Sequence, residues 1–211
     1  MIEPEELRFK CIRCGNCCSD KNTIVNVTYH DILRIKNGLN LNIDEIIEIL
    51  GFYVFKTPPS EEELKRMVVP PIETEQGLAF IGLRKKKEKD YACYFYDPKD
   101  RKCLIYPLRP NFCRTFPFSF RIIFDPQDIT HAKIKMYYTD KSIEYCPGIG
   151  ESAPLINQDD WVEIGKETIE NMSDDKVLIR EWNNAVKEGR IIPSARNYIL
   201  TILQLEEKEE N

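Results

Sequence analysis

Apolar residues recur at helical spacing in two segments that follow residue 27. Thr28, with an acidic residue three positions later, resembles a capping box, and the apolar positions behind it predict a helix over 28–37. Asn42 repeats the capping pattern and predicts a second short helix, for which Gly51 has the position of a C-terminal stop. The region after the first cysteines is therefore expected to be helical.

The middle third has the composition of β-strands. Segments 77–83 and 91–96 are rich in aromatic and branched residues, which predicts a small antiparallel sheet. Segments 118–124 and 129–138 flank Asp125-Pro-Gln-Asp128, a turn signal, and apolar side chains alternate along the second segment. These last two segments are expected to form a hairpin.

Helical spacing returns after residue 159. Trp161 and Met172 share one apolar face, Ser173 can cap a further helix that ends at Gly189, and Pro193 suits the first turn of a last helix. Three helices are expected here. This part contains no cysteine or histidine, so its aromatic residues are interpreted as packing residues.

Composition and charge describe an ordinary globular chain. The 211 residues carry a net charge of −5, with 42% hydrophobic and 31% charged residues. The acidic first residues lack the features of a secretory signal, and no apolar run approaches the roughly 20 residues that span a bilayer. The basic run Arg84-Lys-Lys-Lys87 is interpreted as a solvated loop. We expect a cytoplasmic protein with no nucleic acid or membrane partner, whose redox partner or protein substrate is unknown.

The eight cysteines are the strongest chemical signal in the sequence. Four fall within eight residues, three follow with nine residues between neighbours, and the last precedes a proline: Cys11, Cys14, Cys17, Cys18, Cys93, Cys103, Cys113 and Cys146. Thiolates crowded this tightly repel one another unless a cation or cluster holds them. In a cytoplasmic protein, such clusters are more often metal-binding than disulfide-bonded. All eight are therefore candidate metal ligands.

Three kinds of chemistry can use eight thiols. Disulfides are disfavoured because the vicinal Cys17 and Cys18 are poorly placed to pair across a fold. Two tetrahedral zinc sites would need eight cysteines, but the C-x2-C spacings overlap on Cys14. Iron–sulfur ligation fits the overlap better, because C-x2-C-x2-C opens the bacterial ferredoxin pattern, whose Cys-Pro element is supplied far away by Cys146. We expect a 4Fe-4S cluster, with zinc as the alternative.

The number of sites stays open at this point. Adjacent cysteines in an extended segment point to opposite sides, so Cys17 and Cys18 could serve different sites, and two clusters could use all eight thiols. A single cluster would leave some cysteines as buried hydrophobic residues. The sequence does not assign the thiols to groups.

The residues between the cysteines also form a pattern. Cys11-Ile-Arg-Cys-Gly-Asn-Cys-Cys18, Cys93, Cys103-Leu-Ile-Tyr106 and Arg109-Pro-Asn-Phe-Cys-Arg-Thr-Phe-Pro117 together resemble the CxxCxxCC, or YkgJ-type, cysteine cluster family. The resemblance runs from Phe9 to Cys146. It implies a zinc- or iron-chelating or iron–sulfur-cluster-containing protein, and a related branch includes bacterial flagellin lysine methylases that carry an iron–sulfur cluster. Nothing is implied for the helices after residue 159.

Two arginines flank the cysteine of the last motif. A guanidinium from Arg109 or Arg114 near a thiolate-ligated cluster would offset negative charge and donate hydrogen bonds to sulfur, which raises the reduction potential. Arg109 could instead cap local carbonyls and fix the loop. His30 and His131 are the only histidines, and each is interpreted as a surface or capping residue rather than a ligand.

The expected fold is α+β, with a small antiparallel sheet and metal-binding loops surrounded by helices and a helical C-terminal part. Residues 1–150 would form a cysteine-cluster metal-binding domain, and 151–211 a helical segment packed on it. No nucleotide-binding or metalloprotease motif is present. The leading hypothesis is an iron–sulfur protein in electron transfer or in support of a redox or group-transfer reaction. The alternatives are a structural zinc-binding protein and a protein lysine methylase-like enzyme.

Overall fold

The fold class is α+β, as expected. The computed structural model describes residues 6–86, 91–125 and 128–209. Its helices are α1 (Asn16–Ser19), α2 (Tyr29–Leu39), α3 (Ile43–Ile49), α4 (Glu61–Arg66), α5 (Asn111–Thr115), α6 (Asp140–Tyr145), α7 (Gln158–Lys187) and α8 (Ala195–Glu209), with the 3-10 turn η1 (Tyr106–Leu108). Its strands are β1 (Leu50–Val54), β2 (Ile72–Thr74), β3 (Gly77–Leu83), β4 (Tyr96–Asp97), β5 (Lys102–Cys103), β6 (Phe118–Asp125) and β7 (Asp128–Tyr138).

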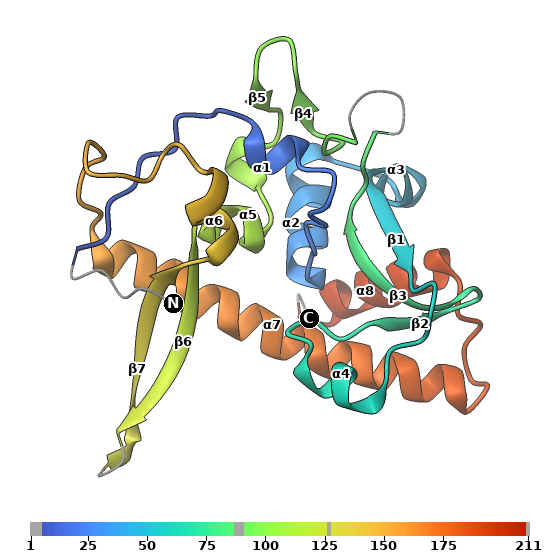
Figure 1. Ribbon diagram of the computed structural model, residues 1–211. Coiled ribbons are helices and arrows are strands. Elements are labelled where there is room, and N and C mark those ends of the chain that lie inside the picture. The colour runs from blue at the N-terminus through green and yellow to red at the C-terminus, as the bar shows by residue number, and fades with distance from the viewer. Residues whose placement is uncertain (1–5, 87–90, 126–127, 210–211) are drawn as a thin grey trace.

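The described strands form separate antiparallel units. β3 is the central strand of a sheet in the order β1-β3-β2, with Phe52 opposite Ile81. β6 and β7 form the predicted hairpin, in which Phe118 lies opposite Tyr138, and β4 pairs with β5. The hairpin lies on one side of the molecule and the three-stranded sheet on the other, with α7 running past both (Figure 1).

Capping boxes begin three helices in the first third of the chain. The side chains of Thr28, Asn42 and Ser60 each accept a hydrogen bond from the third helical residue, whose carboxylate accepts one from the capping residue in return. The boxes at Thr28 and Asn42 confirm the two predicted helix starts. Each cap satisfies backbone N–H groups that a helix terminus would otherwise leave without partners.

The prediction that Gly51 stops the second helix is wrong. The chain passes directly from α3 into β1, where Gly51 lies opposite Gly82 and the buried Leu50 lies opposite Leu83. Pairing with β3, which is distant in the sequence, decides the conformation here. A local glycine signal does not contain that information.

The prediction of a strand over 91–96 is also wrong for most of its length, since only Tyr96 belongs to a strand. The backbone of this segment is used in single contacts with other segments: Cys93 N–H donates to the Cys18 carbonyl and Tyr94 N–H to the Arg84 carbonyl, each at 2.7 Å. β3 pairs with β1 and β2 instead. The segment therefore serves as a connector beside the cysteines.

α7 is one continuous helix of 30 residues, so the prediction that Ser173 begins a new helix is wrong. Its buried face continues across that position, from Thr168 through Asp175 to Trp182. Packing against several elements keeps the helix unbroken where the local capping signal predicts a break. Of the helices that the structure describes, none combines the length and the apolar character needed to cross a bilayer.

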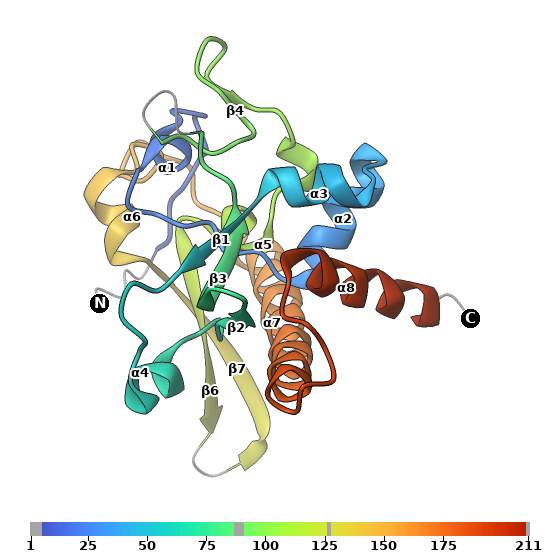
Figure 2. The same cartoon turned by 90° about the vertical axis from the view of Figure 1, so that its right-hand side faces the viewer.

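The hydrophobic core lies where the three-stranded sheet meets α2, α3, α7 and α8. Ile35, Ile46, Ile72, Trp182 and Ile202 are each at most 2% exposed. Residues on both sides of position 150 therefore share one core cluster. Figure 2 shows α8 lying against α2 and α3.

Candidate metal centre

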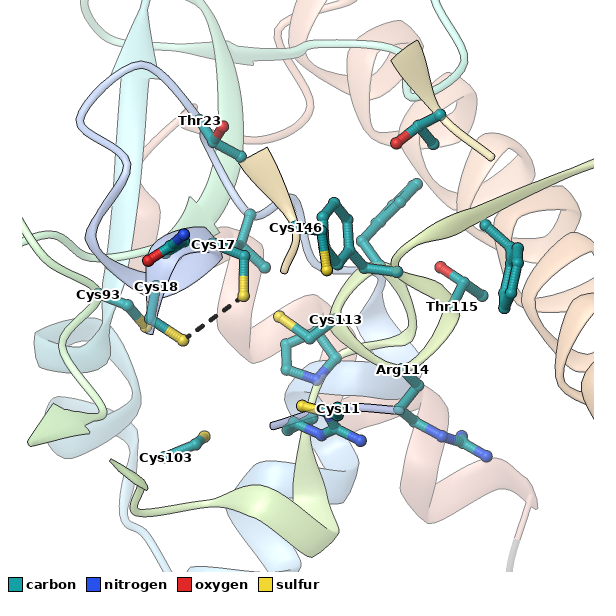
Figure 3. Close-up of a pocket in the computed structure, with 18 of the residues that line it drawn as sticks. Cys11, Cys17, Cys18, Thr23, Cys93, Cys103, Cys113, Arg114, Thr115 and Cys146 are labelled. Carbon is teal, nitrogen blue, oxygen red and sulfur yellow. Dashed lines mark hydrogen bonds between the residues drawn. The ribbon is translucent and has the colours of Figure 1, made fainter. Parts of the chain in front are cut away.

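All eight cysteines line one cavity of about 840 Å³. Its walls come from the N-terminal loop and α1, the segment from β4 to β6, α6 and the first half of α7. In Figure 3, the side chains of Cys17, Cys113 and Cys146 are directed into the same space. Folding thus gathers thiols that are far apart along the chain.

The first four cysteines lie on a loop and on the single turn of α1. The first two precede Gly15, which has a left-handed φ of 83°, and the other two belong to α1. A Cβ at Gly15 would lie 2.0 Å from the Tyr96 hydroxyl oxygen. Both the turn and the close approach of Tyr96 therefore require glycine at this position.

The vicinal cysteines adopt a helical geometry. The expectation that Cys17 and Cys18 lie in an extended segment and point to opposite sides is wrong, because α1 places their sulfur atoms 3.9 Å apart. Both thiols line the cavity. Any division of the thiols into two groups therefore needs evidence other than opposite directions of these side chains.

Cys146 is held beside the N-terminal loop by backbone contacts. Lys10 N–H donates to the Gly148 carbonyl at 3.0 Å, and the Asn16 side-chain amide donates to the Tyr145 carbonyl at 2.9 Å. A Cβ at Gly148 would lie 2.5 Å from the Lys10 carbonyl oxygen, so this approach requires glycine. The two contacts place Cys146 next to the segment that carries Cys11 and Cys14.

The other three cysteines line the cavity from the segment between residue 93 and α5. Cys93 N–H donates to the Cys18 carbonyl at 2.7 Å, and Tyr96 N–H donates to the Cys93 carbonyl at 2.9 Å. Tyr96 in turn pairs with Cys103 in the β4–β5 ladder. Cys113 belongs to α5. The hydrogen bonds and the ladder therefore link Cys18 to Cys93 and Cys103.

A buried polar network fixes the loop that carries Cys113. The fully buried Asp31 carboxylate accepts hydrogen bonds from Asn111 N–H at 3.0 Å and from the Arg34 guanidinium at 2.5 Å. Arg34 also donates to the Arg109 carbonyl at 2.8 Å. Asp31 and Arg34 were not predicted from the sequence as residues that shape the site. A capping acid is usually exposed, so its sequence position gave no sign of this second role.

Arg109 and Arg114 have different surroundings. Arg109 donates to the Tyr106 carbonyl at 3.1 Å and stacks on the Tyr106 ring at 3.8 Å. Burial raises the pKa of Cys103 and Cys113, and the charge of Arg109 offsets part of this rise; the same charge adds to the lowering of the pKa of Cys17 by Cys18. Arg109 therefore both fixes its loop and faces the thiols. Arg114 makes two hydrogen bonds to the Glu167 carboxylate, at 2.5 and 2.9 Å, and its side chain points away from Cys113 (Figure 3).

The thiols differ in their tendency to ionise. A hydrogen bond from Cys18 lowers the pKa of Cys17 to about 7, and the same contact raises the pKa of Cys18. Burial raises the pKa of Cys93 to about 11 and that of Cys113 well above its usual range. Most of these thiols would hold their protons at neutral pH until a cation replaces them. Metal binding is therefore expected to release protons.

The remainder of the cavity is mainly apolar. Beyond the cysteines it is lined by Phe118, Phe120, Trp161, Ile169 and Met172. Phe118 and Trp161 meet edge to face, with ring centroids 4.8 Å apart. Trp161 is expected from the sequence to be a packing residue of the helical C-terminal part, but its side chain also forms part of the cavity wall.

The donor set suits a soft metal or an iron–sulfur cluster. All eight cysteines are free thiols in this structure, and thiolate is the ligand that zinc and iron–sulfur clusters share. Within residues 6–86, 91–125 and 128–209, no three His, Cys, Asp or Glu side chains converge closely enough to hold a single ion. His30 pairs with Asp174 on α7, and the side chain of His131 lies outside the described residues.

Comparison with known proteins agrees with this donor set. A family model described as "CxxCxxCC: Putative zinc- or iron-chelating domain" matches residues 10–147. An uncharacterised protein of Methanocaldococcus jannaschii is 29% identical over 143 residues, which cover 68% of this chain and 59% of that relative. The match thus leaves a substantial part of the relative without a counterpart here. No solved structure shows a significant match.

Proposed function

Because the chain belongs to the CxxCxxCC family of zinc- or iron-chelating domains, we propose that it is an iron–sulfur-cluster-binding protein whose eight cysteines hold the metal. Metal binding follows from membership of the family. The cluster form of the metal, and its use in electron transfer or in a redox or group-transfer reaction, are the proposal.

The observation that carries the proposal is the gathering of eight thiols around one large cavity. A zinc ion binds four sulfur ligands at about 2.3 Å, so it would occupy a small part of the 840 Å³ that these thiols surround. A cluster holds its thiolates farther apart, around a core of several metal and sulfide atoms. The cavity size and the number of thiols therefore support clusters.

The walls of the cavity suit a negatively charged cluster. Arg109 faces the thiols and would offset the charge of a thiolate-ligated cluster, which favours its reduced form. Aromatic and aliphatic side chains line the rest of the cavity and would limit the access of water. A bound cluster would supply reversible one-electron chemistry.

Two features bear on how the cluster would be used. Cys11 and Cys17 are exposed, so one edge of the thiol group faces solvent, where a redox partner could exchange electrons. The apolar part of the cavity, around Phe118 and Trp161, offers room for an organic reactant next to the thiols. The first feature supports electron transfer, and the second supports a reaction beside the cluster. We place the protein in the cytoplasm, where thiols stay reduced.

A structural zinc site is the second candidate. The 3.9 Å between the sulfur atoms of Cys17 and Cys18 is close to the ~3.8 Å that separates two sulfur ligands in a tetrahedral zinc site. Under this alternative the protein would be colourless and would lose stability on chelation.

The test is anaerobic purification followed by measurement of iron, sulfide and zinc per chain. We expect iron and sulfide in equal amounts and a visible absorbance that bleaches on reduction by dithionite. Cys14→Ser and Cys113→Ser should each lower the metal content. Zinc at one or two per chain without iron or sulfide would overturn the proposal in favour of the zinc candidate, and metal content unchanged by both substitutions would show that these cysteines are not ligands.

A further inference from the structure

We propose that the eight cysteines form two centres of four thiols each, which share one cavity. The first, the N-terminal centre, comprises Cys11, Cys14, Cys17 and Cys146. The second, the central centre, comprises Cys18, Cys93, Cys103 and Cys113. This division rests on the proposed function for its metal, but it makes a separate claim about which thiols act together.

The N-terminal centre follows from the contacts around Cys146. Lys10 N–H donates to the Gly148 carbonyl, Phe9 forms a β-bridge with Ile149, and the Asn16 side chain reaches the Tyr145 carbonyl. These contacts lie directly before the C-x2-C-x2-C run and within it, and on both sides of Cys146. The run and the remote cysteine are therefore held side by side by backbone structure, independently of any metal.

This arrangement also completes a known ligand pattern. In two-cluster ferredoxins, three cysteines at C-x2-C-x2-C spacing bind one cluster, and the fourth ligand comes from a Cys-Pro element elsewhere in the chain. Here the run ends at Cys17, and Cys146-Pro147 supplies the remote element. The structure brings the two together, although 128 residues lie between positions 17 and 146 in the sequence. The N-terminal centre thus has the ligand set of a 4Fe-4S cluster.

The central centre follows from a chain of contacts that begins at Cys18. The Cys18 carbonyl accepts the N–H of Cys93, and the Cys93 carbonyl accepts the N–H of Tyr96, which pairs with Cys103 across the β4–β5 ladder. Cys113 enters from α5, whose first residue is anchored on the buried Asp31. One set of contacts thus joins Cys18, Cys93 and Cys103, and the anchor of α5 positions Cys113. Both differ from the contacts that position Cys146.

The vicinal cysteines are where the two centres meet. Cys18 is linked through its own carbonyl to Cys93, which assigns it to the central centre. Cys17 is the last cysteine of the C-x2-C-x2-C run, which assigns it to the N-terminal centre. Their sulfur atoms are 3.9 Å apart, so two centres bound at these positions would be close neighbours. Close neighbours are expected to interact magnetically when both are reduced.

Single substitutions test the division, because each set of cysteines serves as the control for the other. Cys14→Ser, Cys17→Ser and Cys146→Ser should each remove the N-terminal centre and leave the central one. Cys18→Ser, Cys93→Ser and Cys103→Ser should do the reverse. The readouts are iron, sulfide and zinc per chain and the electron paramagnetic resonance spectrum of protein reconstituted anaerobically with ferrous iron and sulfide.

For wild-type protein we expect about eight iron atoms per chain, or about four iron atoms and one zinc ion if the central centre takes zinc. Each substitution should remove one centre and leave the metal of the other in place. The reduced wild type should show a spectrum broadened by interaction between two clusters, or a single-cluster spectrum beside zinc. Far-UV circular dichroism should confirm that each variant keeps its helices.

Several outcomes would overturn the division. Loss of all metal from variants of both sets, with helices retained, would indicate one shared centre. Cys17→Ser behaving like Cys103→Ser would refute the assignment of the vicinal pair. If the variants fail to fold, the wild-type protein alone still tests the division. About four iron atoms per chain, one spin and no zinc would then refute two centres. Two zinc ions without iron, lost one at a time, would refute the iron–sulfur proposal and leave the division standing.

Discussion

The packed core and the cysteine cavity are built from different kinds of contact. In the core, long helices and paired strands meet over nearly inaccessible aliphatic side chains such as Ile35, Ile46 and Ile202. The cysteines around the cavity lie on loops, short helices and a two-residue ladder, which are joined by individual hydrogen bonds such as that from Cys93 to Cys18. Burial of apolar surface stabilises the first region, whereas in the second a bound metal would fix the distances between the thiols.

Helix α2 connects the two regions. Its apolar face, including Ile32 and Ile35, packs in the core, and its first turn carries Asp31, which holds the loop before Cys113. The rigid region thus sets the position of one wall of the cavity. Because the core is densely packed and the cavity is joined by single hydrogen bonds, metal removal should loosen the cavity and leave most of the core folded. Each of the following predictions tests this separation.

The largest expected effect on the free energy of unfolding comes from replacing a tryptophan, and each region contains one. Trp182 is 2% exposed, donates to the Glu73 carbonyl at 3.0 Å and packs edge to face on Tyr198, whereas Trp161 lines the cavity. Trp182→Ala should lower the free energy of unfolding of the metal-free protein by ~3–5 kcal/mol, because it leaves a cavity in the core. Trp161→Ala should cost clearly less, ~1–2 kcal/mol, because its side chain already borders open space.

Urea unfolding followed by far-UV circular dichroism measures both values, since tryptophan fluorescence changes with the substitutions themselves. Equal decreases in the free energy of unfolding for the two variants would show that the cavity wall contributes to stability as much as the core does. The comparison between the regions would then fail.

A second effect concerns a buried carboxyl group of the core. Burial raises the pKa of Asp175 from 3.8 to about 7 in the folded protein, and its carboxylate accepts a hydrogen bond from Tyr29 N–H. Between these two values the folded state keeps a proton that the unfolded chain has released. The free energy of unfolding should therefore fall as pH rises through this window, by at most ~1.4 kcal/mol per pH unit, and change no further above it.

Asp175→Asn should remove this contribution, because the amide keeps an acceptor for Tyr29 but does not ionise. Asp160→Asn, at an exposed position of the same helix, is the matched control for the loss of a carboxylate. Unfolding measured on metal-free protein at several pH values separates this core effect from proton release by the thiols. A profile that Asp175→Asn does not flatten would contradict the raised pKa.

The third effect tests the link between the regions. Asp31→Asn keeps the shape of the side chain but removes the charge that pairs with Arg34. It also replaces one of the two oxygens that accept from Arg34, Asn111 N–H and Thr28 N–H with an NH2 group, which cannot accept. We expect a loss of ~2–3 kcal/mol in the free energy of unfolding and a lower metal content, because a buried charge-assisted contact is broken and the loop before Cys113 loses its anchor. Normal metal content in a destabilised variant would show that the cavity wall does not depend on α2.

Local patterns predicted the parts of the fold that depend on near neighbours in the chain. The capping boxes at Thr28 and Asn42 and the alternation along β7 lie within a few residues, so the sequence alone contains them. The helix stop predicted at Gly51 and the helix start predicted at Ser173 were wrong, because pairing with β3 and packing along α7 decided the conformations there. The competing contacts came from residues distant in the sequence, which a local reading does not include.

The candidate site likewise has a part that local sequence patterns predict and a part that they do not. The cysteines could be named from their spacing, because crowded thiols need a cation, and their role as ligands stays a prediction. Their spatial grouping could not be read from the sequence, because it depends on contacts such as that between Lys10 and Gly148. The extended geometry expected for Cys17 and Cys18 failed for a related reason, since the left-handed turn at Gly15 starts a helical turn there.

The smallest expected effect on stability comes from a comparison of Arg109 and Arg114, the two arginines beside Cys113. Arg114 binds Glu167 at a partly exposed position, so Arg114→Gln should change the free energy of unfolding by ~0.5–1 kcal/mol and leave the reduction potential of a bound centre unchanged. Arg109 faces the thiols, so Arg109→Gln should lower that potential, because less positive charge then stabilises the added electron. Redox titration of the two variants with the wild type decides between these roles. Equal potentials in all three would leave Arg109 with only its contacts to Tyr106, and its role would then belong to the packing of the loop rather than to the thiols.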